Sequence, residues 1–400
     1  MNRRSFVKSS AGLAAFAAFS HPPMFDTRGA IPFSPADLPK SIYPERLKRA
    51  QEMMESTRLD LLFATPGSNF LYMTGYNPGR SERLIALLLP RTGNPVIVAP
   101  SFERERIQQR SVVTDIAVWE EQENPFSLSA SVAGRLGAAN GKVGIEPTTN
   151  YSDFLRLAAS LPGSTLVDGG AVFDELRMAK NPEELDATRK AIDITLASIA
   201  ATHAQLKEGL SEAEVAEILS SEMRKRGSRG DGLVQFGPDS ALPHGGPGDH
   251  QLKAPCVVLI DAGCRVDGYI SDISRTIYWG GESSAKFKQV FNVVLDAQQT
   301  AASIARSGVV CEEMDRAARN VIRKAGFGNY FTHRLGHGIG LDGHEYPYLV
   351  EGNGYKMKEN QTFTIEPGIY LPGEFGVRIE DDFVITGNGV SQLSPRVDPL

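Results

Sequence analysis

The segment HRLGHGIGLDGHE, from His333 to Glu345, contains three of the seven histidines of the chain. Histidine can supply a neutral nitrogen ligand to a metal ion, or carry a proton near neutral pH. A short histidine-rich tract is also compatible with exposed loop residues, or with hydrogen-bonded polar groups in a core. This segment alone leaves the three interpretations open, and the acidic residues elsewhere in the chain must decide between them.

Two acidic residues lie in the segment VVLIDAGCRVDGYISDISRT, whose pattern predicts a β-hairpin. The Asp-Gly dipeptide at 267–268 is typical of a two-residue turn. If it forms the turn, Asp261 lies opposite Ser274. Asp272 then shares a face with Asp261 as its diagonal neighbour, and the backbones of the two residues are roughly 7–8 Å apart. Two carboxylates on one face of an apolar hairpin cost free energy unless a cation or a proton lies between them.

A second predicted hairpin, TFTIEPGIYLPGEFGVRIEDDF, has the same property. A turn centred on Gly373 places Glu366 directly opposite Glu380, each at the end of an apolar strand. The alternative is a pair of exposed acidic residues partnered by Arg275 or Arg378. The recurrence of the pattern in two hairpins, together with the histidine cluster, favours a metal site.

Four carboxylates and one histidine would form an oxygen-rich site. Mn²⁺ and Mg²⁺ suit carboxylates, and one imidazole also allows Co²⁺, Fe²⁺ or Zn²⁺. Five ligands exceed what one ion needs and match two ions that share a hydroxide. We therefore expect two divalent metal ions, with Mn²⁺ as the first candidate.

These residues resemble the metallopeptidase family that contains Xaa-Pro dipeptidase, aminopeptidase P and methionine aminopeptidase, with the pita-bread fold. The resemblance covers residues 181–385 and, more weakly, the part from Tyr43, where SNFLYMTGY is similar to the Xaa-Pro members. The matching motifs are IDAG with SDISRT, THRLGHGIGL, TIEPGIY and VRIEDDF. All five ligand positions are present, whereas creatinase-like and histone-chaperone-like relatives have lost them.

The resemblance implies a role for each site residue. One ion would be bound by Asp261 and the other by His337 and Glu366, with Asp272 and Glu380 bridging both. The expected catalytic residues are His244, His344 and Glu366, and the expected substrate-binding residues are His333 and Arg378. Glu366 is the candidate proton shuttle, because a ligated carboxylate beside the nucleophile can accept its proton.

The elements that must position these residues fall into two groups. Up to about residue 168, short apolar strands alternate with helical patterns, which is typical of an α/β domain. The second half reads as helices, a strand hairpin, helices and a second hairpin. With the resemblance, we expect an α+β protein with a three-layer α/β domain over residues 41–175 and a pita-bread catalytic domain over residues 176–400.

The amino terminus reads as a targeting segment rather than part of the fold. Residues 1–20 have a basic start and a short Ala-rich apolar run, and Arg3-Arg4 followed by Phe6 and Lys8 resembles the twin-arginine export signal. Residues 21–40, rich in proline and polar side chains, are expected to be a tether. We therefore expect export to the periplasm by the twin-arginine route.

The net charge of -6 gives no electrostatic footprint for nucleic acid. The densest basic run, at 224–232, is interpreted as a solvated helix end followed by a turn. No internal segment approaches the ~20 apolar residues that span a bilayer, and three cysteines without C-x-x-C spacing predict no disulfide framework.

The function expected from the resemblance is hydrolysis of the bond before proline in short peptides by a homodimer. The enzyme would be an Xaa-Pro aminopeptidase or an Xaa-Pro dipeptidase. The alternatives are a non-catalytic peptide-binding homologue and a creatinase-like amidino hydrolase on the same scaffold.

Overall fold

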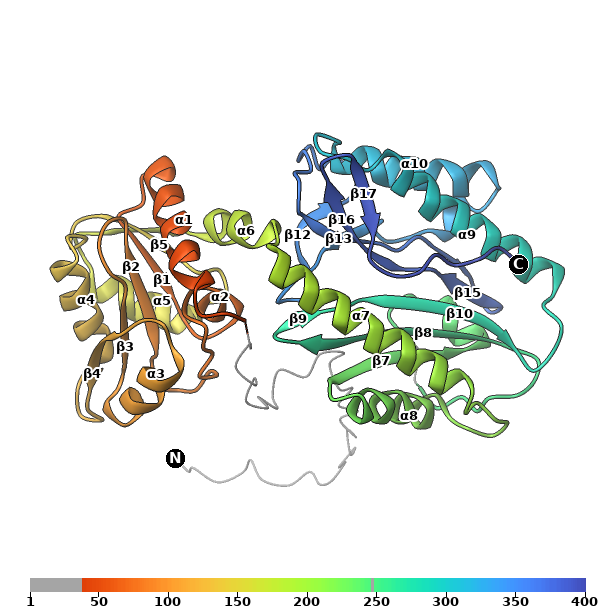
Figure 1. Ribbon diagram of the computed structural model, residues 1–400, viewed down its shortest axis with the longest axis horizontal. Helices are drawn as coiled ribbons and strands as arrows, with labels where there is room; N and C mark the ends of the chain where they lie inside the picture. Colours follow the sequence, from red (N-terminus) through yellow and green to blue (C-terminus); the bar gives the residue numbers. More distant parts are fainter. Residues whose placement is uncertain (1–37, 246–247) are drawn as a thin grey trace, which may run out of the picture. The chain divides into compact units, whose positions relative to one another are not determined.

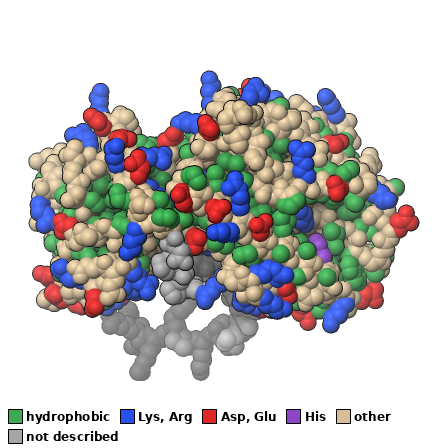
Figure 2. Space-filling model, viewed as in Figure 1, with side chains coloured by type: hydrophobic (Ala, Val, Ile, Leu, Met, Phe, Trp, Pro, Cys, Tyr) green, Lys and Arg blue, Asp and Glu red, His purple; other side chains and the backbone are tan. Residues whose placement is uncertain are grey.

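The structure is a computed structural model that describes residues 38–245 and 248–400 (Figure 1). The expected export signal and nearly all of the expected tether lie outside the described residues. No helix in the described part of the chain is long and apolar enough to cross a membrane. Basic and acidic side chains are interspersed over the face shown in Figure 2.

The amino-terminal part is built on a six-stranded mixed sheet in the order β4-β3-β2-β1-β5-β6. Its strands are β1 (Leu61–Ala64), β2 (Ala86–Pro90), β3 (Val96–Pro100), β4 (Asp115–Trp119), β5 (Lys142–Ile145) and β6 (Thr165–Asp168). Its helices are α1 (Ile42–Thr57), α2 (Ser68–Thr74), α3 (Arg104–Arg110), α4 (Pro125–Arg135), α5 (Tyr151–Ser160) and α6 (Gly170–Met178).

Helices cover both faces of this sheet. Leu61 and Phe63 of β1 pack in a cluster with residues of α4 and α5. The intervening Leu62 and Ala64 pack in a second cluster with residues of α1 and α6. Burial on both faces explains why the central strands read as continuous apolar runs rather than as alternating patterns. The expected three-layer α/β arrangement is confirmed.

The carboxy-terminal part repeats the order of helices followed by strands. The first half contains α7 (Pro182–His203), α8 (Glu212–Lys225), β7 (Arg229–Phe236), β8 (Cys256–Val266), β9 (Tyr269–Ile270) and β10 (Ile273–Trp279). The second half contains α9 (Ala285–Ile304), α10 (Cys311–Lys324), β11 (Gly336–Gly338), β12 (Glu345–Leu349), β13 (Thr362–Ile365), β14 (Gly368–Leu371), β15 (Phe375–Arg378), β16 (Asp381–Thr386) and β17 (Gly389–Gln392).

Each half has its own apolar core. Residues of α7 and α8 pack on β7, β8 and β10, and residues of α9 and α10 pack on the strands from β13 to β16. Helix α7 begins with a capping box, in which the side chains of Asn181 and Glu184 each accept a hydrogen bond from the backbone N–H of the other residue. The expected pita-bread arrangement is confirmed, with the two hairpins lying against helices.

The interpretation of the basic run was wrong in one respect. The chain enters strand β7 at Arg229, within the expected turn, and pairs with β8 over eight residues. The glycines at 230 and 232 have no side chain, so the first half of this strand lacks the alternation of apolar and polar residues that predicts a strand. They are required by close packing: a Cβ at Gly230 would lie 2.2 Å from the carbonyl oxygen of Gly263. The three cysteines are free thiols, as expected.

Candidate metal and peptide site

The first hairpin has the expected register. Asp261 pairs with Ser274, and both turn residues, Asp267 and Gly268, have positive φ angles, as a type I′ turn requires. Asp272 lies in the interruption between β9 and β10, where no strand partner constrains it. Its side chain comes within ligand-sharing distance of the carboxylate of Asp261, as the sequence predicted.

The second hairpin also has the expected register, but it is divided between two sheets. Strands β14 and β15 pair in one sheet, β13 and β16 pair in another, and the acidic residues lie where the chain passes between them. Gly368 pairs with Arg378 in one ladder, and Ile365 pairs with Asp381 in the next. Glu366 and Glu380 lie opposite each other in the gap between the two ladders. Pro367 cannot donate a ladder hydrogen bond, which favours an interruption here.

The glutamates are anchored from outside the hairpin. Glu366 N–H donates to the carbonyl of Leu335 at 2.8 Å, and Glu380 N–H donates to the carbonyl of Ser274 at 3.2 Å. These bonds tie the second hairpin to the first hairpin and to the segment before β11. Glu380 is 2% exposed, so the alternative of exposed acidic residues is wrong for it. Arg275 donates to the side chain of Asp381 instead.

His337 is delivered to this site by β11, the Gly-His-Gly strand of the histidine cluster. A Cβ at Gly336 would lie 2.0 Å from the carbonyl oxygen of Thr364, and one at Gly338 would lie 2.4 Å from that of Tyr346. Only glycine therefore fits on either side of the histidine. This explains why glycines separate the histidines in the cluster.

The tautomer of His337 follows from its hydrogen bond. Nδ1 lies 3.0 Å from the carbonyl oxygen of Gly338, which only accepts, so Nδ1 carries the proton. Nε2 is left with a lone pair, 3.3 Å from Glu366 and 3.8 Å from Asp272. Burial holds the pKa of His337 well below its usual value, which keeps the ring neutral. A neutral imidazole oriented by its second nitrogen is the form that binds metal ions.

The five predicted ligands form two groups that share one member. One group is Asp261, Asp272 and Glu380, and the other is His337, Glu366 and Glu380; within each, one ligand atom per residue lies within 4.8 Å of the others. Two groups joined through Glu380 could hold two neighbouring ions. The sequence-based set is thus brought together in full.

The electrostatics of the cluster fit a bound cation. Burial, and next the charge of neighbouring carboxylates, raises the pKa of Asp272 and of Glu380 well above the usual range. Burial raises the pKa of Glu366 to about 8 even though Arg378 opposes the shift. The described protein atoms therefore carry too little positive charge to keep these carboxylates ionised, which divalent ions would supply.

Arg378 lies behind the cluster and is 3% exposed. Its guanidinium donates to Asp261 at 2.6 Å and to the hydroxyl of Tyr370 at 2.9 Å. Its Nε donates to Ser274 Oγ, whose own hydroxyl lies 2.7 Å from Glu380. The residue thus orients two predicted ligands, while its expected contact with substrate stays a prediction.

Sequence reasoning missed three polar residues that support the ligands: Ser274, Tyr370 and Asp382. Asp382 is fully buried and accepts the backbone N–H of Asp272. The signal was present, because Ser274 belongs to SDISRT, Tyr370 to TIEPGIY and Asp382 to VRIEDDF. The sequence interpretation assigned no role to these three residues because they are not predicted ligands.

His333 and Tyr370 form a neutral pair beside the ligands. His333 Nε2 lies 2.8 Å from the hydroxyl of Tyr370. Burial, and next the charge of Arg378, lowers the pKa of His333 to about 3, so its ring is uncharged at neutral pH. The exposed His244 lies close enough that its charge lowers the pKa of both His333 and His344.

His344 lies in the loop between β11 and β12, and its ring centre is 4.2 Å from that of His337. It comes within ligand distance of Asp272 and His337. Geometry alone therefore admits His344 as a ligand, and its expected action on substrate stays a prediction.

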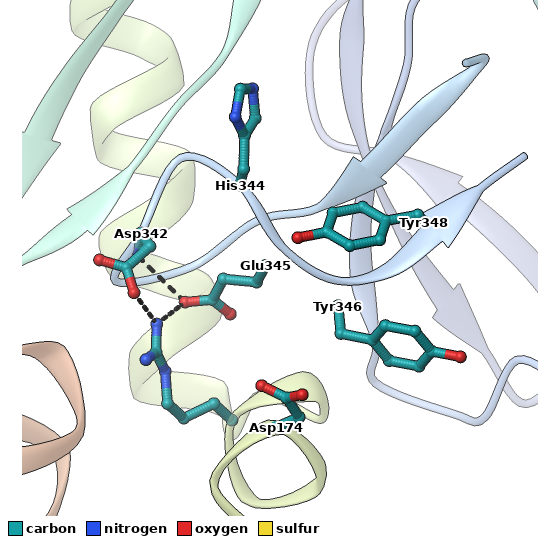
Figure 3. Close-up of a pocket in the computed structure, with 7 residues that line it drawn as sticks. Asp174, Asp342, His344, Glu345, Tyr346 and Tyr348 are labelled. Carbon is teal, nitrogen blue, oxygen red and sulfur yellow. Dashed lines mark hydrogen bonds and ion pairs between the residues drawn. The ribbon is translucent and has the colours of Figure 1, made fainter. Parts of the chain in front are cut away.

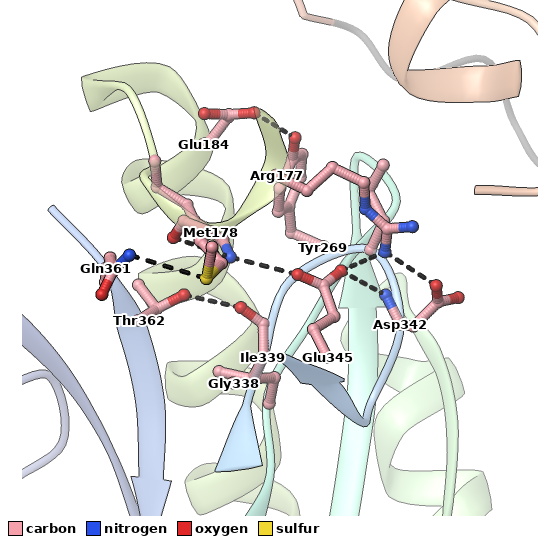
Figure 4. Close-up of polar contacts among 12 residues, drawn as sticks. Arg177, Met178, Glu184, Tyr269, Gly338, Ile339, Asp342, Glu345, Gln361 and Thr362 are labelled. Carbon is pink, nitrogen blue, oxygen red and sulfur yellow. Dashed lines mark hydrogen bonds and ion pairs between the residues drawn. The ribbon is translucent and has the colours of Figure 1, made fainter. Parts of the chain in front are cut away.

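The loop of His344 is clamped at its base (Figures 3 and 4). Arg177 at the end of α6 donates to Asp342 at 2.7 Å and also bonds Glu345. Lys180 lies 3.2 Å from the other oxygen of Glu345. Two cations on one carboxylate hold both ends of the loop that carries His344. A cavity of about 140 Å³ lies beside the loop and is lined by His344, Tyr346 and Tyr348 among others.

Comparison with known proteins agrees with this geometry. Metallopeptidase family M24 matches residues 186–387, and the creatinase/prolidase N-terminal domain matches residues 46–179. The chain belongs to metallopeptidase family M24. It is therefore a metallopeptidase, of a family that uses divalent metal ions.

Relatives of this M24 chain resemble it over nearly their whole length. An uncharacterized peptidase of Staphylococcus aureus strain USA300 is 33% identical over 352 residues, which is 87% of this chain and 98% of the relative. The dipeptidase PepE of Mycobacterium ulcerans has a TM-score of 0.85 at 34% identity, covering 94% of this chain and 99% of its own. The prolidase of Thermococcus sibiricus has a TM-score of 0.83 at 33% identity, covering 90% and 98%.

Proposed function

We propose that this metallopeptidase hydrolyses the peptide bond before proline in short peptides, using two divalent metal ions. The observation that carries the proposal is the pair of ligand groups joined through Glu380. The likeness to a prolidase and a dipeptidase over almost the full chain supports the substrate class.

The residues divide the work by their position and charge. Asp261 would hold one ion and His337 with Glu366 the other, and both ions would share Asp272 and Glu380, which lie near the ligands of each. Mn²⁺ is our first candidate, and Co²⁺, Fe²⁺ or Zn²⁺ would also suit the ligands. Such ions lower the pKa of water toward neutrality and stabilise negative charge that develops on a carbonyl oxygen.

The remaining chemistry falls to side chains. Glu366 accepts a proton from the attacking water, because its carboxylate lies among the ligands. His344 is exposed, and partial desolvation with the charge of Arg334 lowers its pKa. Its ring donates a hydrogen bond to the scissile carbonyl. His244 holds the substrate amide, and His333, bonded to Tyr370, lines the substrate pocket.

Cleavage before proline requires a site that does not depend on the N–H of the scissile bond. The bond before proline is a tertiary amide without an N–H, so a groove that recognises extended peptides through that group cannot hold it. A site that grips the carbonyl oxygen and the pyrrolidine ring instead accepts such bonds.

The test is a metal and substrate titration of the purified chain. Chelated protein is reloaded separately with Mn²⁺, Co²⁺, Fe²⁺ and Zn²⁺, and the bound metal per chain is measured. Hydrolysis of Xaa-Pro peptides is then compared with that of matched Xaa-Ala peptides and of creatine. We expect two ions per chain and cleavage of the proline peptides. Two bound ions without cleavage of any proline peptide would contradict the proposal.

We further propose that the chain is exported to the periplasm through its twin-arginine signal and functions as a homodimer. Replacing Arg3 and Arg4 by lysine should retain active enzyme inside the cell. Cell fractionation with peptidase assays measures this, and a periplasmic variant would contradict the export route.

The homodimer is tested by the molecular mass of the mature enzyme in analytical sedimentation.

A further inference from the structure

A pocket separate from the metal and peptide site lies in the carboxy-terminal part, between α7, β10 and the last residues of the chain. Its volume is about 460 Å³, within the range of roughly 300–1,000 Å³ that holds small-molecule ligands in proteins. Successive side chains of a strand point to opposite faces. On β10, Ser274 bonds the predicted ligand Glu380, and the next residue, Arg275, lines the pocket. The strand therefore separates the pocket from the metal ligands.

The walls of the pocket are mostly apolar. They include the side chains of Leu196, Ile199, Ile277, Tyr278, Phe291 and Ile379. The carboxy-terminal wall is held in place, because the backbone N–H and carbonyl of Leu400 each form a hydrogen bond of 2.9 Å with the side chain of Asn292 on α9 (Figure 1). Aromatic rings in such a lining favour a flat apolar ligand.

One polar atom in this lining has no partner. Nε2 of His203, the last residue of α7, is buried and makes no hydrogen bond with any of the described residues. A buried polar group without a hydrogen bond costs free energy, and such groups are rare in folded proteins. Burial, and next the charge of Arg275, lowers the pKa of His203 to about 4, so the ring is neutral at pH 7. The imidazole therefore offers a ligand a hydrogen bond without a charge.

The charged groups of the pocket do not select an anion. Arg275 donates to the buried carboxylate of Asp381 at 2.6 Å. Its other hydrogen bonds go to the backbone carbonyls of Ser274 and Glu380. The exposed Asp398 also lines the pocket and adds a negative charge. Because the one arginine of the lining is already compensated, an uncharged ligand fits this pocket better than an anion.

We propose that this pocket binds an uncharged aromatic molecule that carries one hydroxyl group, with the hydroxyl on Nε2 of His203 and the ring among the apolar side chains. A hydroxyl both donates and accepts, so it satisfies Nε2 in either tautomer of the neutral imidazole. Burial of the ring in the apolar lining supplies the driving force. The proposal does not depend on cleavage before proline, since none of the predicted metal or substrate residues lines the pocket.

The experiment compares three probes of similar shape, 4-ethylphenol, ethylbenzene and 4-ethylbenzoate, by calorimetric titration of the mature enzyme loaded with Mn²⁺. 4-Ethylphenol should bind once per chain and roughly 3- to 10-fold more tightly than ethylbenzene, the size of one neutral hydrogen bond. 4-Ethylbenzoate should bind most weakly. His203→Phe keeps an aromatic ring without the nitrogen, and should bind 4-ethylphenol and ethylbenzene equally.

Two tryptophan variants locate the binding. Ala197 and Ala200 are both exposed on α7, and of the two only Ala200 lines the pocket. Ala200→Trp should therefore occupy the pocket and weaken 4-ethylphenol by roughly 10-fold or more, because the probe loses its apolar contacts. Ala197→Trp should bind it as the wild type does. This pair decides the location even if His203→Phe fails to fold.

Equal binding of 4-ethylphenol to both tryptophan variants would overturn the inference, and so would a wild type that binds none of the probes up to their solubility limits. Tightest binding of 4-ethylbenzoate would overturn the assignment of an uncharged ligand. A His203→Phe variant that still prefers 4-ethylphenol would overturn the role of Nε2.

Discussion

Carboxylates and histidines come together twice in the described part of this chain, once around Glu380 and once where Glu212, Asp239 and His250 meet. In the second cluster the charges are compensated by the protein. Phe236 N–H donates to Glu212 at 2.6 Å, and His250 Nδ1 lies 2.5 Å from Asp239. Burial raises the pKa of Glu212 to about 7, which favours a proton held between the two acidic residues.

The cluster around Glu380 has the same residue types but few donors. Burial raises the pKa of Asp272, Glu366 and Glu380, and the negative charge of neighbouring carboxylates raises each pKa further. The difference teaches that ligand spacing alone does not define a metal site. A deficit of positive charge and of hydrogen-bond donors, in a buried position, distinguishes the cluster that we propose holds ions from the one whose charges the protein compensates.

The largest effect should follow from breaking the shared ligand. Glu380→Ala should lower turnover by roughly 10³-fold or more, because both ligand groups lose a member and the ions supply several kcal/mol of charge stabilisation. Bound metal, measured by elemental analysis, should fall below two per chain. The matched change Asp239→Asn should keep both metal and activity. Full metal content in Glu380→Ala would show that the site has been assigned wrongly.

The two clusters should also differ in their histidines. His344→Ala should lower turnover by roughly 10²-fold, the contribution of a positioned acid–base or oxyanion-binding group. It should leave two ions per chain, while His250→Ala changes neither quantity. Steady-state kinetics with metal analysis measures both. Loss of an ion from His344→Ala would place this histidine among the ligands.

Metal should stabilise the fold through one cluster only. At a free ion concentration of 100 times the dissociation constant, binding adds about 2.7 kcal/mol to the free energy of unfolding. Mn²⁺ added to chelated wild type should therefore raise the unfolding temperature, and the same rise should occur in Glu212→Gln. It should disappear in Asp272→Asn. A metal response that vanishes in Glu212→Gln would contradict the distinction between the clusters.

The smallest expected effect is a pH dependence at Glu212. Its pKa is about 7 in the folded chain and 4.5 as the ordinary value. Its stabilising contribution is therefore complete below pH 4.5 and is lost as pH rises through 7. The exposed His250 admits water, so we expect a loss of about 1–2 kcal/mol in unfolding free energy between pH 5 and pH 8.

Glutamine imitates the protonated form of this residue at every pH. Glu212→Gln should therefore unfold at nearly the wild-type urea concentration at pH 5 and at a higher one than wild type at pH 8. Asp239→Asn serves as a second variant, because it removes the neighbouring charge that raises the pKa of Glu212. Identical pH profiles for wild type and Glu212→Gln would contradict the shared proton.

Local chemistry made the two hairpins predictable. The Asp-Gly turn at 267–268 fixes the partner of Asp261, and the turn at Gly373 fixes the opposition of Glu366 and Glu380, because strand register is set by the nearest turn. Strand β7 was not anticipated, since glycines at 230 and 232 leave no alternating pattern. Close backbone packing against β8, a contact distant in sequence, is what demands them.

The sequence by itself determined the five predicted ligands, the register of both hairpins and the family. These depend on residue identity and on spacings within about twenty positions. Only the tertiary structure decided which charges are compensated. It buried Arg378 against Asp261, clamped the His344 loop with Arg177 and placed the N–H of Phe236 against Glu212. The physical reason is that an ionisable group responds to burial and to neighbours within a few ångströms, and packing brings those neighbours from distant parts of the chain.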